Sequence, residues 1–252
     1  MYKLRVFSPN KSCAPLRLAT FNKRILLRFG STTPLISKFK YTEINSIEGV
    51  IQSSNKITMK QIFDKINIHH SNWINTTNIH ELLAFYNKYK ILIAKHKRSS
   101  QGKNIYYIDT IESLRELINN INLKDFVFEE YCFFPNEYRM HVDADHGLFY
   151  ACKKVLKEDA DVEWHRHFNN SIFVRITEDM ELPECWNDII NECKQVCKAM
   201  NMNILCFDIL CSNNNFILVE TNSAPALATY GLTQYLNHIQ KYYGNIKENR
   251  RL

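Results

Sequence analysis

Two apolar segments, residues 204–211 and 216–221, are separated by four polar residues, and this pattern predicts a β-hairpin. Alternate side chains of a strand share one face, so Asp208 is expected to lie near Glu220 and Asn222. Two carboxylates and an amide oxygen on an otherwise apolar hairpin suit a magnesium ion. A solvent-facing strand edge is the alternative. The apolar neighbours on both strands disfavour it, because acids buried without a cation are costly.

The rest of the sequence shows further strand and helix patterns. Apolar runs bounded by turn residues predict strands over residues 24–29, 47–52, 91–94, 104–108, 126–131, 138–142, 147–154 and 172–176. Apolar positions at helical spacing predict helices over residues 55–66, 77–86, 110–121, 185–200 and 232–243. The strands after residue 125 are expected to form one antiparallel sheet, and the whole order predicts an α+β protein.

The charge balance limits the classes of partner. Lys and Arg number 32 and Asp and Glu 26 among the 252 residues, which gives a formal charge of +6. This mild excess suits an anionic ligand such as a nucleotide and makes nucleic acid an unlikely partner. No apolar run approaches the ~20 residues of a membrane span, and the N-terminus lacks the apolar stretch of a signal peptide. We therefore expect a cytoplasmic protein with no membrane partner; a viral origin stays open.

Eight cysteines are scattered along the chain without a tight repeated spacing. Cys193 and Cys197 are four residues apart on one face of an expected helix, and His165 and His167 are the histidines that could complete a zinc site. Nothing in the sequence brings these two pairs together. Buried, reduced thiols in a reducing compartment are the favoured interpretation.

Asp208 and the segment 217–225 (ILVETNSAP) together resemble the closing signature of the ATP-grasp enzymes, which include D-alanine–D-alanine ligase, glutathione synthetase and the ribosomal-protein glutamate ligases. Other motifs occur in the family's order from Lys56 onward, over two thirds of the chain. The pattern is most similar to phage-type and glutamate-ligase-like members. The resemblance implies an ATP-grasp fold, with two α+β subdomains clasping the nucleotide and a shortened N-terminal lobe. The expected divisions are 1–52 (N-terminal lobe), 53–125 (small subdomain with phosphate loop), 126–245 (large subdomain with adenine linker and metal site) and 246–252 (basic tail).

The resemblance assigns a phosphate-binding side to the small subdomain. Lys56, just before a helix, and Lys95, at the end of a strand, stand where the family has two phosphate-contacting lysines. The loop that follows keeps Ser100 and Gly102 of the family's Gly-rich loop, but it lacks one proline and one glycine. Backbone amides in such a loop can cradle phosphate. A solvated basic hairpin tip is the alternative.

The resemblance also assigns an adenine and ribose side. Residues 128–132 match the linker strand whose main chain contacts adenine, which makes Glu129, Glu130, Tyr131 and Cys132 candidates. Either of the two glutamates could face the base. Glu137, about seven residues further on, matches the ribose-binding glutamate, because a carboxylate can accept from both ribose hydroxyls. Its alternative is an ion pair with a neighbouring arginine on an edge strand.

Cationic residues of the large subdomain match the family's catalytic positions. Arg139 stands where related members have an arginine near the acceptor or γ-phosphate, and Lys153 or Lys154 matches the lysine near the γ-phosphate. The sequence leaves open which lysine points inward. The aromatic and basic loop 164–170 either contributes to the acyl-phosphate side or caps the sheet.

One departure concerns the arginine that several ligases carry two residues before the metal aspartate, where this chain has Cys206. Its role falls to Arg139, Arg166 or Arg175, or is lost.

The resemblance implies an ADP-forming ligase that uses ATP and Mg²⁺ to join a small-molecule or peptide carboxylate to an amine through an acyl-phosphate. Positioning and electrostatics would carry such a reaction without a protein nucleophile. Three alternatives stay open, namely an ATP-grasp kinase, a nucleotide-binding pseudoenzyme that acts through a partner and, last, a basic nucleic-acid binder. The substrates and the oligomeric state are not indicated by the sequence.

Overall fold

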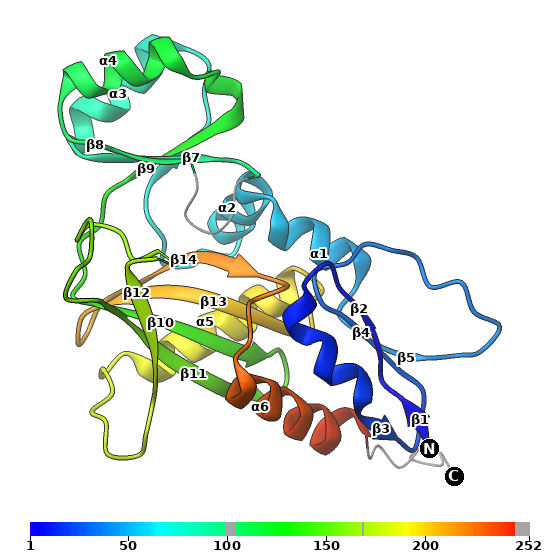
Figure 1. Ribbon diagram of the computed structural model, residues 1–252. Helices are drawn as coiled ribbons and strands as arrows, with labels where there is room; N and C mark the ends of the chain where they lie inside the picture. The colour runs from blue at the N-terminus through cyan, green and yellow to red at the C-terminus, as the bar shows by residue number, and fades with distance from the viewer. Residues whose placement is uncertain (99–103, 168, 245–252) are drawn as a thin grey trace.

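Four β-sheets and the helices packed on them make up the protein, for which the computed structural model describes residues 1–98, 104–167 and 169–244. One sheet has four strands and another has five. In Figure 1 the four-stranded sheet and the helices packed on it lie at the top, the five-stranded sheet lies below, and the N-terminal strands lie beside the five-stranded sheet. The predicted α+β class is confirmed. Every helix in the described ranges is too short or too polar to span a bilayer.

The five-stranded sheet is antiparallel, in the order β12-β11-β10-β13-β14. Its strands are β10 (Asn136–Asp143), β11 (Gly147–Leu156), β12 (Ser171–Arg175), β13 (Ile204–Cys211) and β14 (Phe216–Asn222). The helix α5 (Trp186–Ala199) packs on one face, because Ile189, Cys193 and Val196 recur once per turn and are fully buried. Helices α1 (Ile47–Ser54) and α2 (Lys56–Lys65) join the same core.

The two faces of this sheet have different chemistry. Tyr138, Met140 and Phe207 point into the core under α5. Side-chain alternation therefore directs Glu137, Arg139 and Asp208 to the opposite face. We call this opposite face, which carries the charged residues, the polar face of the five-stranded sheet.

A β-bulge in the β13–β14 hairpin determines which side chains of β14 lie on the polar face. Asp208 is opposite Glu220, whereas Ile209 is opposite Leu218, so Val219 has no partner of its own. Leu218 and Glu220 are two residues apart and would share a face in a regular strand. Because of the bulge, Leu218 enters the core while Glu220 lies on the polar face beside Asp208.

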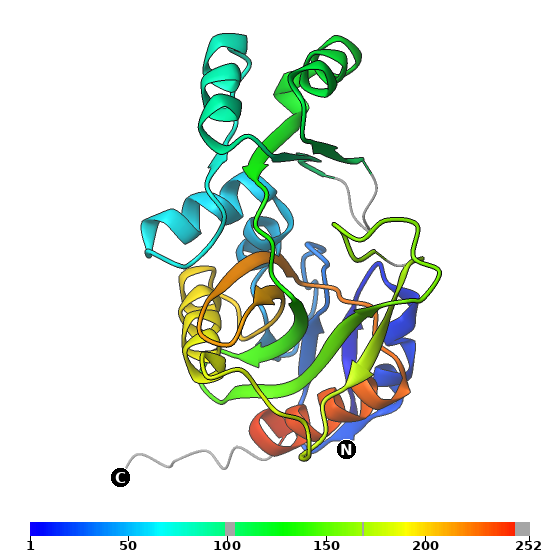
Figure 2. The same ribbon diagram turned by 90° about the vertical axis from the view of Figure 1, so that its left-hand side faces the viewer.

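A second core belongs to the four-stranded antiparallel sheet, which has the order β6-β9-β7-β8. Its strands are β6 (Trp73–Ile74), β7 (Leu92–His96), β8 (Ile105–Ile108) and β9 (Phe126–Glu130), the last preceded by the short helix η2 (Leu123–Asp125). Helices α3 (Ile79–Tyr89) and α4 (Ile111–Asn120) cover the face turned away from the five-stranded sheet (Figures 1 and 2).

Residues 126–131 were expected in the same sheet as the later strands, and this expectation is wrong. The strand β9 pairs with β6 and β7 instead. The chain passes from one sheet to the other between β9 and β10, at residues 131–135. Residues 47–52 were also expected as a strand but form α1, which begins where the Ser46 hydroxyl accepts from the Gly49 amide.

The N-terminal lobe is built from very short strands. A parallel sheet in the order β2-β4-β5 contains β2 (Arg5–Phe7), β4 (Ile25–Arg28) and β5 (Thr42–Ile44). The strands β1 (Tyr2–Lys3) and β3 (Thr20–Phe21) pair beside it, and the 3₁₀ helix η1 (Lys11–Leu18) lies between β2 and β3. The C-terminal elements α6 (Thr229–Ile239) and η3 (Gln240–Gly244) complete its core.

Most of the predicted helices and the predicted β13–β14 hairpin are confirmed. The Asn55 side chain caps α2, and Thr110 and Ser113 form a capping box at the start of α4. The strands 92–96 and 105–108 pair antiparallel, as do β13 and β14. The expected basic tail lies outside the described residues, and the expected domain limits stay predictions.

Candidate functional site

The three predicted metal ligands converge on the polar face. Asp208 of β13 lies opposite Glu220 of β14, and the Asn222 amide nitrogen is 3.5 Å from Asp208 Oδ2 and 3.4 Å from Glu220 Oε1. In the described ranges no cluster has three or more His, Cys, Asp or Glu side chains suited to a metal; this group has two carboxylates and an amide. The donor set is one that Mg²⁺ prefers, although the amide must turn to offer its oxygen.

Arg139 is the nearest cation to this acid group. Its Nε and Nη2 donate to the two oxygens of Asp208 at 2.7 and 2.8 Å, a bidentate pair between adjacent strands. Burial would raise the pKa of Asp208, but the Arg139 guanidinium outweighs it and holds that pKa at about 2. Arg139 therefore supplies the positive charge beside Asp208. Cys206, two residues before Asp208 in β13, has no such charge. Arg166 and Arg175 have other partners. Arg166 pairs with Glu137 and donates to the Pro135 carbonyl, and the Arg175 guanidinium lies over the Tyr230 ring.

The register of β10 and β11 separates the two candidate lysines. Lys154 is opposite Glu137, and its Nζ lies 2.9 Å from Glu137 Oε1 on the polar face. Lys153 is opposite Tyr138 and lies over that ring, 5.9 Å from its centre, on the other face. Of the pair, Lys154 is therefore the lysine that belongs to the candidate site.

Glu137 has two cationic neighbours, because Arg166 Nη1 is 3.6 Å from its second oxygen. The pKa of Glu137 is nevertheless raised, first by burial and then by the charge of Asp208, against the lowering effect of Lys154 and Arg166. The alternative pairing of Glu137 with Arg139 does not occur, because Arg139 holds Asp208.

Lys56 and Lys95 reach the candidate site from different elements. Lys56, the first residue of α2, lies 3.9 Å from Glu220 Oε2. Lys95 of β7 is on the face of the four-stranded sheet that turns away from α3 and α4, and its Nζ is 3.0 Å from Glu129 Oε1. Ser100 and Gly102, the predicted remainder of the phosphate loop, lie outside the described residues.

The linker residues divide into two groups. Glu129 is buried against Lys95, whereas Glu130 accepts from the main-chain and side-chain nitrogens of Asn72. Tyr131 packs edge-on against Tyr107, with ring centres 5.3 Å apart. The Cys132 thiol is half-buried, and burial raises its pKa to about 12.

Sequence reasoning missed Lys60, whose side chain is fully buried in α2. Its Nζ lies 2.9 Å from Glu129 Oε2 and donates to the Ser71 hydroxyl at 2.9 Å. A signal was present, because Lys60 is one turn after Lys56 and one turn before the buried Phe63, and residues at that spacing share a helical face.

Residues 157–167, between β11 and β12, join the two sheets. Trp164 stacks on Tyr107 of β8 with ring centres 5.1 Å apart, and Figure 2 shows this segment rising toward the four-stranded sheet. The pKa of His165 is lowered to about 4, first by burial and then by the charges of Lys154, His167 and Lys95. Lys95 and Lys154, which come from different sheets, therefore act on the same side chain.

Buried neutral groups lie behind the acids. His141 is fully buried, forms a 2.9 Å hydrogen bond with the Tyr235 hydroxyl and stacks on Tyr150. Its pKa is lowered to about 3, first by burial and then by the Arg139 charge. The zinc interpretation gains no support, because Cys193 and Cys197 lie in the core under α5 whereas His165 and His167 lie in the 157–167 segment.

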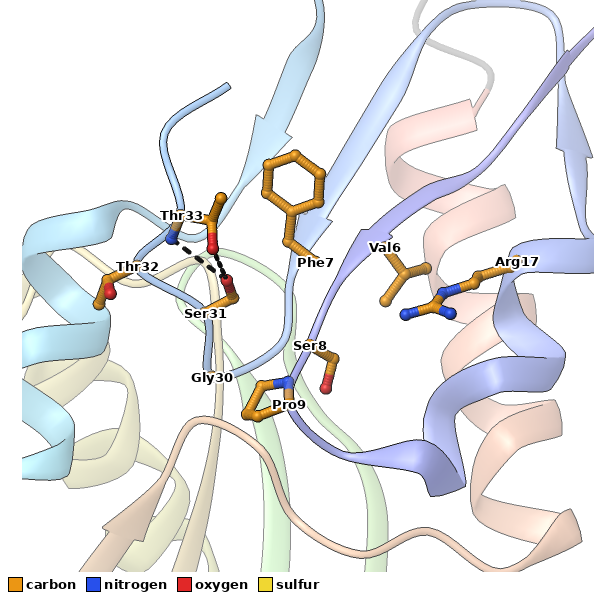
Figure 3. A pocket seen from close by; sticks show the side chains of 9 residues that line it. All are labelled: Val6, Phe7, Ser8, Pro9, Arg17, Gly30, Ser31, Thr32 and Thr33. Carbon is orange, nitrogen blue, oxygen red and sulfur yellow. Dashed lines mark hydrogen bonds between the residues drawn. The ribbon is translucent and has the colours of Figure 1, made fainter. Parts of the chain in front are cut away.

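A pocket of about 470 Å³ opens in the N-terminal lobe at the carboxyl ends of β2 and β4, lined by residues 6–9, Arg17 and residues 30–33. Figure 3 shows hydroxyl groups of Ser8, Ser31 and Thr33 around it. Ligands of open parallel sheets bind at this edge. A Cβ added to Gly30 would lie 2.5 Å from the Ala224 Cβ, so the pocket adjoins the loop that follows Asn222.

Neither a family model nor a curated protein matches the sequence. Among solved structures, the ATP-grasp ligase PsnB complexed with minimal precursor is similar (TM-score 0.61, 11% identity, 80% of this chain and 64% of that chain). So are the D-alanine–D-alanine ligase from Bacillus anthracis (0.60, 15%, 79% and 66%) and the D-alanyl-alanine synthetase A from Vibrio cholerae O1 biovar eltor (0.61, 16%, 80% and 64%).

These likenesses show the fold: the chain has the ATP-grasp fold, as the sequence resemblance implied. The aligned part spans slightly less than two thirds of each of these neighbours. At 11–16% identity the comparison concerns the fold and leaves the reaction to the side chains of the site.

Proposed function

We propose that this chain is an ATP-dependent, magnesium-requiring ligase that joins a carboxylate to an amine through an acyl-phosphate. One observation carries the proposal. Asp208, Glu220 and Asn222 gather on one sheet face, and Arg139, on the strand next to Asp208, donates to both oxygens of that acid through Nε and Nη2. An acid group with a fixed guanidinium beside it suits a reaction in which negative charge moves between phosphate and carboxylate oxygens.

The side chains have separate tasks in the proposed first step. Lys95 and Lys154 bind phosphate oxygens of ATP, and Glu137 accepts from the ribose hydroxyls. Asp208, Glu220 and Asn222 would hold magnesium, which neutralises phosphate charge when it is bound. The substrate carboxylate then attacks the γ-phosphorus, the bond to the β-phosphate oxygen breaks, and ADP leaves.

In the second step an amine attacks the acyl carbon, the bond from that carbon to the phosphate oxygen breaks, and inorganic phosphate leaves with the bonding electrons and takes up the proton that the amine loses. Arg139 is the proposed cation for the oxygen that gains charge, since it replaces the arginine absent at Cys206. The pocket in the N-terminal lobe adjoins the loop after Asn222 and is the candidate place for part of a substrate.

The test is ATP turnover by the purified protein with Mg²⁺ across pools of amino acids and short peptides. A ligase releases ADP only when an acceptor is present and forms an amide. The variants Asp208→Asn and Glu220→Gln are expected to lose Mg²⁺-dependent turnover, and Arg139→Lys to lose most of it, because Lys cannot make the bidentate pair. Asp188→Asn, an exposed acid on α5, is the matched control and is expected to be unchanged.

The other outcomes separate the alternatives. A phosphorylated acceptor without an amide identifies a kinase, and ATP binding without turnover identifies a nucleotide-binding pseudoenzyme. If Asp208→Asn and Glu220→Gln leave both binding and turnover unchanged, the site assignment is wrong.

A further inference from the structure

A buried charge cluster connects α2 to the four-stranded sheet. It consists of Lys60, Ser71, Lys95 and Glu129. The Glu129 carboxylate lies 2.9 Å from Lys60 Nζ through one oxygen and 3.0 Å from Lys95 Nζ through the other. The Ser71 hydroxyl accepts from Lys60 and donates to Glu129 at 2.6 Å, which closes a ring of contacts on the Lys60 side.

This cluster contains more positive than negative charge. It has two lysine side chains and one carboxylate, and among the described residues Glu129 is the one acid paired with either lysine. The pKa of Lys60 is lowered, first by burial, although the contact with the Glu129 carboxylate opposes this lowering. The pKa of Glu129 is held well below its usual range by Lys60 and Lys95, although burial alone would raise it. Surplus charge in a buried place is costly unless a counter-ion arrives.

Only one member of the cluster exposes this surplus positive charge to solvent. The side chains of Lys60 and Glu129 are 0% and 4% exposed, whereas that of Lys95 is 12% exposed. The remaining titratable neighbours add no compensating charge: the pKa of the half-buried His70 is lowered by burial and by Lys60, and that of the Cys132 thiol is raised to about 12. An incoming anion therefore meets the surplus charge at Lys95.

We propose that Lys60 is a positioning residue for phosphate binding: by taking half of the Glu129 carboxylate, it leaves Lys95 with charge for the polyphosphate of a nucleotide. Without Lys60, Glu129 and Lys95 would form a closed one-to-one pair, and the charge offered to phosphate would fall. The inference rests on the proposed function, because it assumes that Lys95 binds nucleotide phosphates.

The experiment compares Lys60→Met, which keeps most of the buried volume, with the double variant Lys60→Met/Glu129→Gln. Binding of ATP, inorganic tripolyphosphate and adenosine is measured by calorimetry. Lys60→Met is expected to weaken ATP and tripolyphosphate binding by about tenfold to a hundredfold, the range for a charge-assisted hydrogen bond, and to leave adenosine binding unchanged. The double variant is expected to regain most of the lost affinity, because Lys95 is released again.

Lys65→Met is the matched control, because it also removes one lysine charge but from an exposed position of α2. It is expected to bind ATP and tripolyphosphate like the wild type. Recovery in the double variant distinguishes positioning from a structural role, which would predict equal or greater loss. If Lys60→Met does not fold, Ser71→Ala takes its place and is expected to weaken tripolyphosphate binding in the same direction by a smaller factor.

Two results overturn the inference while the proposed function stands. One is weaker ATP binding in Lys95→Met together with unchanged binding in Lys60→Met or Ser71→Ala. The other is a double variant that binds no better than Lys60→Met. A wild-type protein that binds neither ATP nor tripolyphosphate overturns the proposed function as well.

Discussion

Single residues of the polar face have charge states that can be tested, and Glu137 is the clearest case. Its pKa is raised above the usual 4.5 by burial, although Lys154 and Arg166 oppose the rise. The ionised carboxylate is the form proposed to accept from both ribose hydroxyls. Binding that depends on this form is complete above the folded pKa and is lost as the pH falls through it.

We therefore predict that affinity for adenosine, which carries no phosphate to titrate, falls with decreasing pH while the pH is still above the ordinary range of a glutamate. Lys154→Met is expected to move this fall to higher pH, because burial and the Asp208 charge then act on Glu137 with less opposition. Fluorescence titration at each pH, with circular dichroism as the folding control, measures the effect. An affinity that is flat to about pH 4.5 in both proteins contradicts the prediction.

At the scale of elements, two glycines allow strain and crowding to be separated. Gly30, after β4, has φ +74°, and a Cβ there would lie 2.5 Å from the Ala224 Cβ. Gly147, the first residue of β11, has φ +80°, but an added Cβ would meet nothing nearer than 3.9 Å. Both positions disfavour a side chain for the same backbone reason.

We predict that Gly147→Ala lowers the free energy of unfolding by about 1 kcal/mol, and that Gly30→Ala lowers it by about 1–3 kcal/mol more because of the crowding. Urea unfolding of both variants measures this difference. Gly30→Ala is also expected to weaken Mg²⁺-dependent turnover, since the loop it displaces follows Asn222. Equal losses of stability in the two variants would mean that the loop after β14 moves away from the added methyl group with no loss of unfolding free energy.

The segment between β11 and β12 offers a second test at this scale. Trp164 stacks on Tyr107, and this contact joins the segment that carries His165 to the sheet that carries Lys95. Aromatic pairs contribute about 0.5–1.5 kcal/mol beyond their burial. Trp164→Leu and Tyr107→Leu are each expected to raise the Kd for ATP several-fold.

The double variant is expected to bind ATP no more weakly than the worse single variant, because both changes remove the same contact. Isothermal titration of the four proteins completes the cycle. Additive losses would show that the two rings act on ATP binding independently.

Comparison of sequence and structure shows which kinds of information are local. The β13–β14 hairpin was predicted because its strands are neighbours in sequence and alternate visibly. The bulge at Val219 was not, because it depends on Leu218 packing in a core built partly by α2 and α5. Likewise Lys153 and Lys154 are adjacent, and only the pairing of Glu137 with Lys154 decides which one faces the site.

The strand pairings that were missed are non-local or very short. Sequential strands are usually neighbours, which favoured pairing residues 126–130 with β10, but β9 pairs instead with β7, some thirty residues earlier. Strands of two or three residues, such as β2 and β5, are too short to show alternation. Lys60 was missed because an ion pair that satisfies a buried lysine is visible only once the tertiary partners are known.

At the scale of the whole molecule, the candidate site draws on two separate cores. Lys95 stands on the four-stranded sheet and Lys154 and Asp208 on the five-stranded sheet, and the chain crosses between them at residues 131–135. A ligand that contacts both sheets stabilises them together. Binding at about a hundred times Kd contributes about 2.7 kcal/mol, which raises the Tm by roughly 5–11 °C for a chain of this size.

We predict that ATP with Mg²⁺ gives such a rise as a single transition and slows amide hydrogen exchange in residues 92–96 and in 204–222 together. Asp208→Asn is expected to keep the part of the protection that ATP gives without Mg²⁺ and to lose the increment that Mg²⁺ adds. Exchange measured by mass spectrometry reports both segments in one experiment, with α5 as an internal reference away from the polar face. Protection confined to residues 92–96 would place the nucleotide on the four-stranded sheet alone. A ligand that binds both sheets slows the opening of both.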